Sequence, residues 1–179
     1  MNATAEQLSE ICTACGMCCD GTLFRHANIR NDVDKLLAES LGLTTGIKNT
    51  RQHFLQPCHH FNQQCTIYER KRPHVCGAYF CDPIRKVKRA QMLFSEAETV
   101  IAKAVRLNRQ FAAVRVNFPE FADMSIPQIR NELNFSELPT EQQIAMRRTY
   151  APLLLIGIQL FPLILEIIGP QRTKKEPSL

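Results

Sequence analysis

The first eleven residues, Met1–Ile11, contain no basic residue and no apolar run. A secretory signal needs both, so we expect a chain that stays in a reducing compartment, the cytoplasm. In such a compartment, cysteines favour metal binding or catalysis over disulfide bonds. The sequence also lacks a glycine-rich loop placed between a strand and a helix, which removes the commonest sequence evidence for a nucleotide-binding site.

The composition is that of an ordinary soluble protein. The chain has 179 residues, of which 45% are hydrophobic and 22% are charged, and its formal net charge is +5. This length predicts one domain, or one domain with an appendage, that can bury a hydrophobic core.

Cysteine is the residue type that stands out, because its eight copies fall into two groups. The first group lies within Cys12–Cys19, and the second is spread over Cys58–Cys81. Thiolate sulfur is a good ligand for zinc, copper(I) and iron–sulfur clusters. The predicted metal ligands are Cys12, Cys15, Cys18, Cys19, Cys58, Cys65, Cys76 and Cys81.

The spacing of the first group does not complete either of two well-known cluster patterns. Its first three cysteines follow the start of the bacterial ferredoxin spacing, but Thr22 stands where the fourth cysteine would be. The radical-SAM spacing C-x3-C-x2-C is absent. Cys18 and Cys19 are adjacent, and neighbouring side chains in an extended chain point apart. One of the two is therefore expected to serve a second ion or the distal group.

The second group has no local metal-binding turn, so only folding can gather its thiols. Metal binding would then tie the two segments together and contribute folding energy. Eight thiols suit two four-thiolate sites or one binuclear site with bridging sulfurs. The expected cofactor is zinc or iron, with an iron–sulfur cluster as an option.

Histidines and aspartates near the cysteines are weaker ligand candidates. We expect at most one histidine ligand, with His59 or His74 leading among His26, His53, His59, His60 and His74. Asp20 and Asp82 each follow a cysteine. For both, helix capping or a hydrogen bond to a neighbouring amide is preferred over iron ligation.

The pattern along the chain predicts an α+β, mostly helical fold. A small irregular cysteine-rich metal-binding core should pack against a long amphipathic helix and C-terminal helices. We expect a cysteine-cluster domain at 1–83, a helical region at 84–172 and a disordered tail at 173–179. Within these, we expect a helix after Asn31 and a short strand at 66–68, and Thr140 with Gln143 forms a predicted capping box.

The helical spacing of apolar residues predicts one amphipathic helix from about 84 to 114, broken at most once. Residues 151–168 are almost wholly apolar and are flanked by basic residues. Their length approaches that of a membrane span, but Gln159 and Pro162 lie near the middle, where both are costly in lipid. A buried or peripheral segment is preferred, and a membrane anchor is the alternative.

Basic residues concentrate between Glu69 and Ala90, where seven basic residues face two acidic ones. Such a patch suits phosphate, an acidic partner or a membrane surface. A solvated loop and helix start beside anionic thiolates is preferred, because four thiolates around zinc leave a formal charge of about −2. The basic residues are Arg70, Lys71, Arg72, Arg85, Lys86, Lys88 and Arg89.

Several short motifs in order resemble the YkgJ-type CxxCxxCC cysteine-cluster family. They are Cys12-x2-Cys15-x2-Cys18-Cys19-Asp20-Gly21, Pro57-Cys58, Cys65-Thr66-Ile67-Tyr68-Glu69-Arg70, Arg72-Pro73 and Cys76. The resemblance covers roughly residues 10–85 and implies a zinc- or iron-chelating domain without a settled general activity. Cys81 and the segment after Ala151 lie outside the motif.

The sequence therefore predicts a cysteine-cluster protein that chelates zinc or iron with thiolates from two segments, and it leaves enzymatic activity open. One alternative is an iron or iron–sulfur enzyme or redox protein that modifies a protein or nucleic acid. Another is a nucleic-acid-binding module that uses the basic stretch 70–89. The expected partner is a metal ion, with a protein partner possible, nucleic acid disfavoured, and membrane contact through 151–168 possible.

Overall fold

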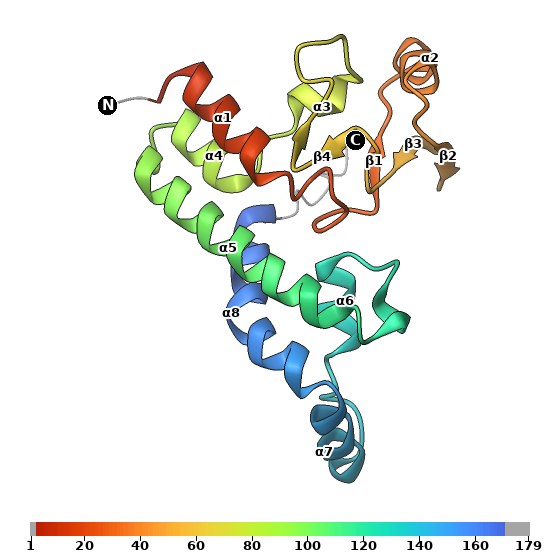
Figure 1. The fold of residues 1–179 in the computed structure, drawn as a ribbon, viewed down its shortest axis with the longest axis vertical. Coiled ribbons are helices and arrows are strands. Elements are labelled where there is room, and N and C mark those ends of the chain that lie inside the picture. The colour runs from red at the N-terminus through yellow and green to blue at the C-terminus, as the bar shows by residue number, and fades with distance from the viewer. Residues whose placement is uncertain (1–2, 171–179) are drawn as a thin grey trace, which may run out of the picture.

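The computed structural model describes residues 3–170, so the predicted tail at 173–179 lies outside the described residues. Figure 1 shows the short strands and α2 gathered at one end, while α5 and α8 run side by side away from them. The helices are α1 (Ala5–Cys15), α2 (Asp32–Ser40), α3 (His74–Ala78), α4 (Asp82–Lys88), α5 (Phe94–Arg115), α6 (Ile126–Glu132), α7 (Thr140–Thr149) and α8 (Ala151–Ile168), with a 3-10 turn η1 (Pro119–Phe121).

The strands form two small antiparallel sheets. In the first, β3 (Arg51–Leu55) lies between β1 (His26–Asn28) and β2 (Thr45–Lys48). The second pairs β4 (Phe61–Asn62) with β5 (Gln64–Cys65). The mostly helical α+β class predicted from the sequence is confirmed.

The predicted helix after Asn31 is confirmed as α2. The Asn31 side chain accepts a hydrogen bond from the Asp34 amide at 2.9 Å, as expected of an N-cap. Asp34 is itself buried, and its second role is to accept a hydrogen bond from the His74 amide at 2.7 Å. This carboxylate therefore fixes the start of α3, which carries Cys76, against α2.

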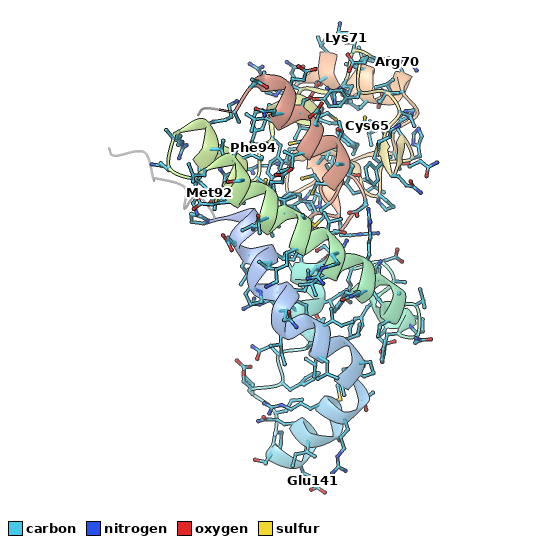
Figure 2. The ribbon with its side chains drawn as sticks, turned by 60° about the vertical axis from the view of Figure 1, so that its left-hand side comes forward. Cys65, Arg70, Lys71, Met92, Phe94 and Glu141 are labelled. Carbon is cyan, nitrogen blue, oxygen red and sulfur yellow. The ribbon has the colours of Figure 1, made fainter. Side chains whose placement is uncertain are left out.

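The long amphipathic helix is also confirmed, and it is broken once. Residues 89–93 separate α4 from α5, and the buried residues of α5 recur at three- and four-residue spacing. Figure 2 labels Met92 and Phe94 at this corner. The buried positions of α5 are Ala97, Ile101, Ala104, Leu107 and Phe111.

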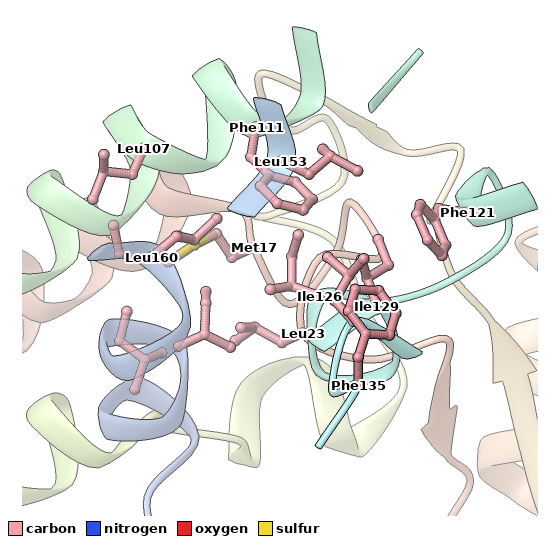
Figure 3. Packing of buried hydrophobic residues seen from close by; sticks show 14 residues of the cluster. Met17, Leu23, Leu107, Phe111, Phe121, Ile126, Ile129, Phe135, Leu153 and Leu160 are labelled. Carbon is pink, nitrogen blue, oxygen red and sulfur yellow. The ribbon is translucent and has the colours of Figure 1, made fainter. Parts of the chain in front are cut away.

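The apolar segment 151–168 forms one helix, α8, which contributes one face to the largest hydrophobic cluster. Figure 3 shows Leu153 and Leu160 beside Phe111 and Leu107 of α5. Met17 and Leu23, from the first cysteine segment, belong to the same cluster. The loop that follows α1 is therefore anchored on the helices by apolar packing.

The opposite face of α8 is exposed. Leu155 and Ile158 are 70% and 71% exposed. The mean hydropathy of α8 is 2.2, so that by length and composition alone it is apolar enough to cross a membrane, and 28% of it is buried in the protein. The same test is passed by core helices of soluble proteins, which are mostly buried.

One helix was not predicted, and two local predictions were wrong. Ala5–Cys15 is the helix that was not predicted, and it has a capping box between Thr4 and Gln7. The second sheet ends at Cys65, and 66–68 form a turn instead of a strand. At α7 the helix begins as expected, but its N-cap is Pro139 with no side-chain bond, and Gln143 donates instead to the Leu138 carbonyl.

Candidate metal centre

All eight cysteines line one cavity of about 310 Å³ between α1 and the second cysteine segment. Each is a free thiol. The remaining lining is mainly apolar and includes Leu23, Phe54 and Ile167, which are buried in the core. The structure thus brings the two sequence groups to one place, as the sequence predicted they would be gathered.

The thiols sort into two neighbourhoods, and the first combines three cysteines of the N-terminal group with Cys81. Burial raises the pKa of Cys12 to about 11, and the Cys81 thiol adds to this rise. Burial also raises the pKa of Cys18, and the nearby thiols include Cys15, Cys19 and Cys81. Cys81 precedes α4 as its N-cap residue, so the start of that helix delivers the fourth sulfur.

The local structure explains how Cys12, Cys15 and Cys18 come together. Cys12 and Cys15 are three residues apart in the last turn of α1, so they lie on the same face of the helix. Gly16 then ends the helix with φ of +62°, a left-handed conformation that glycine adopts easily. A Cβ at this position would overlap the Phe61 ring. The resulting turn carries Cys18 back towards the helix end.

The second neighbourhood joins Cys19 to the three remaining cysteines. The pKa of Cys19 is raised to about 12, first by burial and then by the charges of Cys76, Cys58 and Cys65. A backbone hydrogen bond of 2.7 Å from the Cys58 amide to the Cys19 carbonyl links the two segments. The thiols that act on Cys19 therefore come from the second group, whereas Cys18 is influenced by Cys19, by Cys81 and by the other cysteines of the first group.

The contribution of Cys76 comes from α3. The residue is exposed as a whole, but loss of water around its sulfur raises its pKa to about 11, with the Cys58 thiol adding and the Arg72 guanidinium opposing. For Cys12, Cys18, Cys19 and Cys76, burial and the charges of neighbouring thiols raise the pKa and so disfavour the thiolate near neutral pH. A bound cation reverses this balance and deprotonates the sulfurs.

The donor set fits a thiophilic metal. Eight sulfurs that line one cavity match what zinc or iron–sulfur sites use. Tyr79 adds an independent observation: its hydroxyl is buried and has no hydrogen-bond partner among residues 3–170. Burial chiefly raises the pKa of Tyr79, and the next contributions come from Cys18 and Cys81. A thiolate beside this hydroxyl would give it the acceptor that it lacks.

The sulfurs are not drawn together into a coordination sphere. Among residues 3–170, no group of three or more His, Cys, Asp or Glu side chains is arranged to hold a metal ion. His26 and His60 line the cavity, whereas the favoured candidates His59 and His74 are not among its lining residues. The His60 ring is also hydrogen-bonded to the Leu41 carbonyl at 2.9 Å.

The aspartates that follow cysteines serve local roles. Asp20 accepts a hydrogen bond from the Thr22 amide at 2.8 Å. Asp82 pairs with Arg85 at 3.0 Å and with Lys86 at 2.9 Å, one turn further along α4. The Asp20 contact agrees with the expected hydrogen bond to a neighbouring amide, whereas Asp82 forms side-chain ion pairs instead of a helix cap or an amide hydrogen bond.

The basic stretch divides between internal contacts and exposed positions. Arg85 donates to the carbonyls of Phe80 and Ile168, which joins α4 to the end of α8. Arg70 and Lys71 are exposed, and Figure 2 shows them at the end of the molecule opposite Glu141. The described basic residues therefore do not form one continuous free face.

Sequence reasoning missed the position of Tyr79 and the placing of Cys81 beside the first cysteine group. Tyr79 lies between Cys76 and Cys81, but nothing in its spacing marks it as a neighbour of Cys18. Its ring packs edge-on against Phe24, with centroids 5.3 Å apart. The capping box at Thr4 was the available signal for α1, and with it for the shared face of Cys12 and Cys15.

Comparison with known proteins gives one family match. Residues 11–98, about half of the chain, match the model of the CxxCxxCC family, described as a putative zinc- or iron-chelating domain. No curated protein and no solved structure matches.

Proposed function

Since residues 11–98 are a CxxCxxCC domain, we propose that the protein chelates zinc or iron with all eight cysteine thiolates, divided into two sites of four. The first site takes Cys12, Cys15, Cys18 and Cys81. The second takes Cys19, Cys58, Cys65 and Cys76. The observation that carries this proposal is the sorting of eight cavity-lining thiols into these two neighbourhoods.

The division explains the adjacent cysteines. Neighbouring side chains point apart when the chain is extended, so Cys18 and Cys19 suit two different ions. Each ion would also join distant parts of the chain, since Cys81 completes the first set and Cys19 completes the second. Metal binding would then stabilise the fold, because each ion would link segments that lie far apart in the sequence.

Four thiolates close the coordination sphere of a tetrahedral ion, which is typical of structural sites rather than catalytic ones. The chain's own residues would offset the resulting negative charge. The Arg72 guanidinium opposes the burial that raises the pKa of Cys76, so its positive charge acts on the second set. The role that follows is a metal-stabilised binding module. Use of an iron–sulfur centre in redox chemistry is the alternative that the same donors allow.

The test is metal analysis of protein isolated without oxygen and without added metal. The proposal predicts about two zinc or iron atoms per chain at mononuclear sites. A colourless protein with zinc supports structural sites, and a brown protein with acid-labile sulfide supports iron–sulfur clusters. A matched variant, His59→Ala, should keep its full metal content, because His59 is not among the lining residues of the cavity.

The cytoplasm remains our proposed location. Its support is chemical, because a reducing compartment keeps eight thiols available for metal. Membrane association through 151–168 is the competing proposal, and its support is the exposed apolar face of α8. Cell fractionation of the tagged full chain, with a carbonate wash, separates the two.

A further inference from the structure

A second cavity, of about 450 Å³, adjoins the cysteine cavity. It is built by α1, α3, α4 and the turn that contains Tyr68 and Arg72. The two cavities share a wall, which is formed by Cys12, Tyr68, Arg72, Cys76 and Tyr79. The size is within the range of pockets that hold small molecules.

The charged residues of this lining are all positive. Arg72 lies over the Tyr68 ring, with its guanidinium carbon 4.1 Å from the ring centroid. Lys88 lies over the Phe80 ring, with its nitrogen 3.9 Å from the centroid. The lining contains no aspartate or glutamate. Two cations held in place by aromatic rings thus border a cavity whose wall supplies no carboxylate to neutralise them.

The rest of the wall offers hydroxyl groups and an apolar surface. The hydroxyls of Ser9 and Tyr68 are hydrogen-bonded to each other across α1 and the Tyr68 turn. Leu8 and Val87 are buried residues that present the apolar side. This combination, with a few positioned polar groups on a largely apolar wall, is typical of small-molecule sites.

We propose that this cavity binds a small organic anion. Its carboxylate or phosphate group is held by Arg72 and Lys88, and its short apolar body lies against Leu8, Val87 and Phe80. Arg72 offers a planar pair of donors that suits either anionic group, while Lys88 acts as a point charge. The proposal uses none of the metal ligands as ligand-binding groups. Arg72 borders both cavities, whereas Lys88 lines only this one, so Lys88 separates anion binding from metal chelation.

The test is calorimetric titration of the full chain, as isolated, with four probes. Octanoate and octyl phosphate carry both features, octanol carries only the apolar body, and inorganic phosphate carries only the charge. We expect octanoate or octyl phosphate to bind at least about tenfold more tightly than octanol or inorganic phosphate. The tighter of the two anions identifies the preferred head group.

Variants assign the binding to this cavity. Arg72→Gln should weaken binding of the tighter-binding anion about tenfold. Lys88→Gln should weaken it by a smaller factor, because Lys88 is more exposed than Arg72. Lys71→Gln and Arg89→Gln remove exposed neighbouring charges outside the lining and should leave the affinity unchanged. Lys88→Gln is the decisive variant if Arg72→Gln folds poorly.

Equal affinity for octanol and octanoate would overturn the proposal, since the cavity would then select only apolar bulk. An unchanged affinity in Lys88→Gln, with a loss in Arg89→Gln, would also overturn it by placing the anion elsewhere. Metal content is measured on the same samples. If Lys88→Gln loses anion binding while its metal content stays full, the result supports the anion site independently of the metal sites. If the protein is isolated without metal and still binds octanoate, the result contradicts metal chelation and leaves the anion site standing.

Discussion

Substituting each of the two adjacent cysteines separately tests the division of the thiols. Cys18 lies near Cys15 and Cys81, whereas Cys19 lies near Cys76, Cys58 and Cys65. Cys18→Ser should therefore remove the ion of the first set and spare the second, and Cys19→Ser should do the reverse. Each variant should fall from about two metal ions per chain to about one, because each set has four ligands of its own.

The assay combines metal analysis with mass spectrometry after alkylation of accessible thiols. In Cys18→Ser the label should appear on Cys12, Cys15 and Cys81, because released thiols become reactive while metal-bound ones stay protected. In Cys19→Ser it should appear on the other set. Complete metal loss in both variants would indicate one shared binuclear centre and would refute the division. Full metal retention in either variant would remove that cysteine from the ligand set.

Three further predictions follow from the same geometry. Gly16→Ala should destabilise the protein by about 1 kcal/mol or more in urea unfolding, because it places a Cβ at positive φ against the Phe61 ring. The control is Gly77→Ala, which should be neutral or slightly stabilising, because a Cβ at Gly77 meets nothing within 4 Å. The metal-free protein should be most stable below about pH 9 and should lose stability between about pH 9 and pH 11. The reason is that Cys12 and Cys76 have raised pKa values in the folded state, so the unfolded chain binds fewer protons in that pH range. A free energy of unfolding that stays constant over this range would contradict the burial of the thiols. Tyr79→Phe should leave the metal-free protein no less stable, because the hydroxyl that is lost has no hydrogen-bond partner in the described residues. The same variant should lose its metal to a chelator faster than the parent protein. Equal rates of metal loss in the two proteins would show that Tyr79 does not support the metal centre.

The helical part of the fold was readable from the sequence because apolar spacing dominates there. The run from Ile84 to Val114 carries helical periodicity over many turns, and the break at 89–93 alters it little. Asn31 lies before α2 and Gly42 lies after it, and these residue types are preferred at the start and just past the end of a helix, respectively. Periodicity and end signals are local, so one sequence is enough to show them.

The parts that were missed depend on contacts between distant residues. The short strand expected at 66–68 is a turn, because β5 ends at Cys65 and local preference was too weak to place it. The apolar residues of α2 were visible, but Val33 and Leu36 are 70% and 65% exposed, so spacing did not reveal which side faces the core. Cys81 gave no sign in its spacing that it belongs with Cys12, since that proximity arises from the packing of α4 beside α1.

The sequence identified the candidate metal ligands, but it did not show which of them lie close together. Eight clustered thiols identified the chemistry of the ligands, and the adjacency of Cys18 and Cys19 indicated a second destination for one of them. Which thiols share a neighbourhood required the turn at Gly16 and the backbone bond between Cys58 and Cys19. The preference for His59 or His74 as a histidine ligand stays a prediction, although His59 follows Cys58 in sequence and does not line the cavity.

Elemental analysis of the anaerobically isolated full chain is the most direct measurement of whether these thiols hold metal. The account predicts about two zinc or iron atoms per chain, with the metal released when the thiols are alkylated under denaturing conditions. Protein that is isolated without metal, and that takes up neither zinc nor iron after reduction, would contradict it.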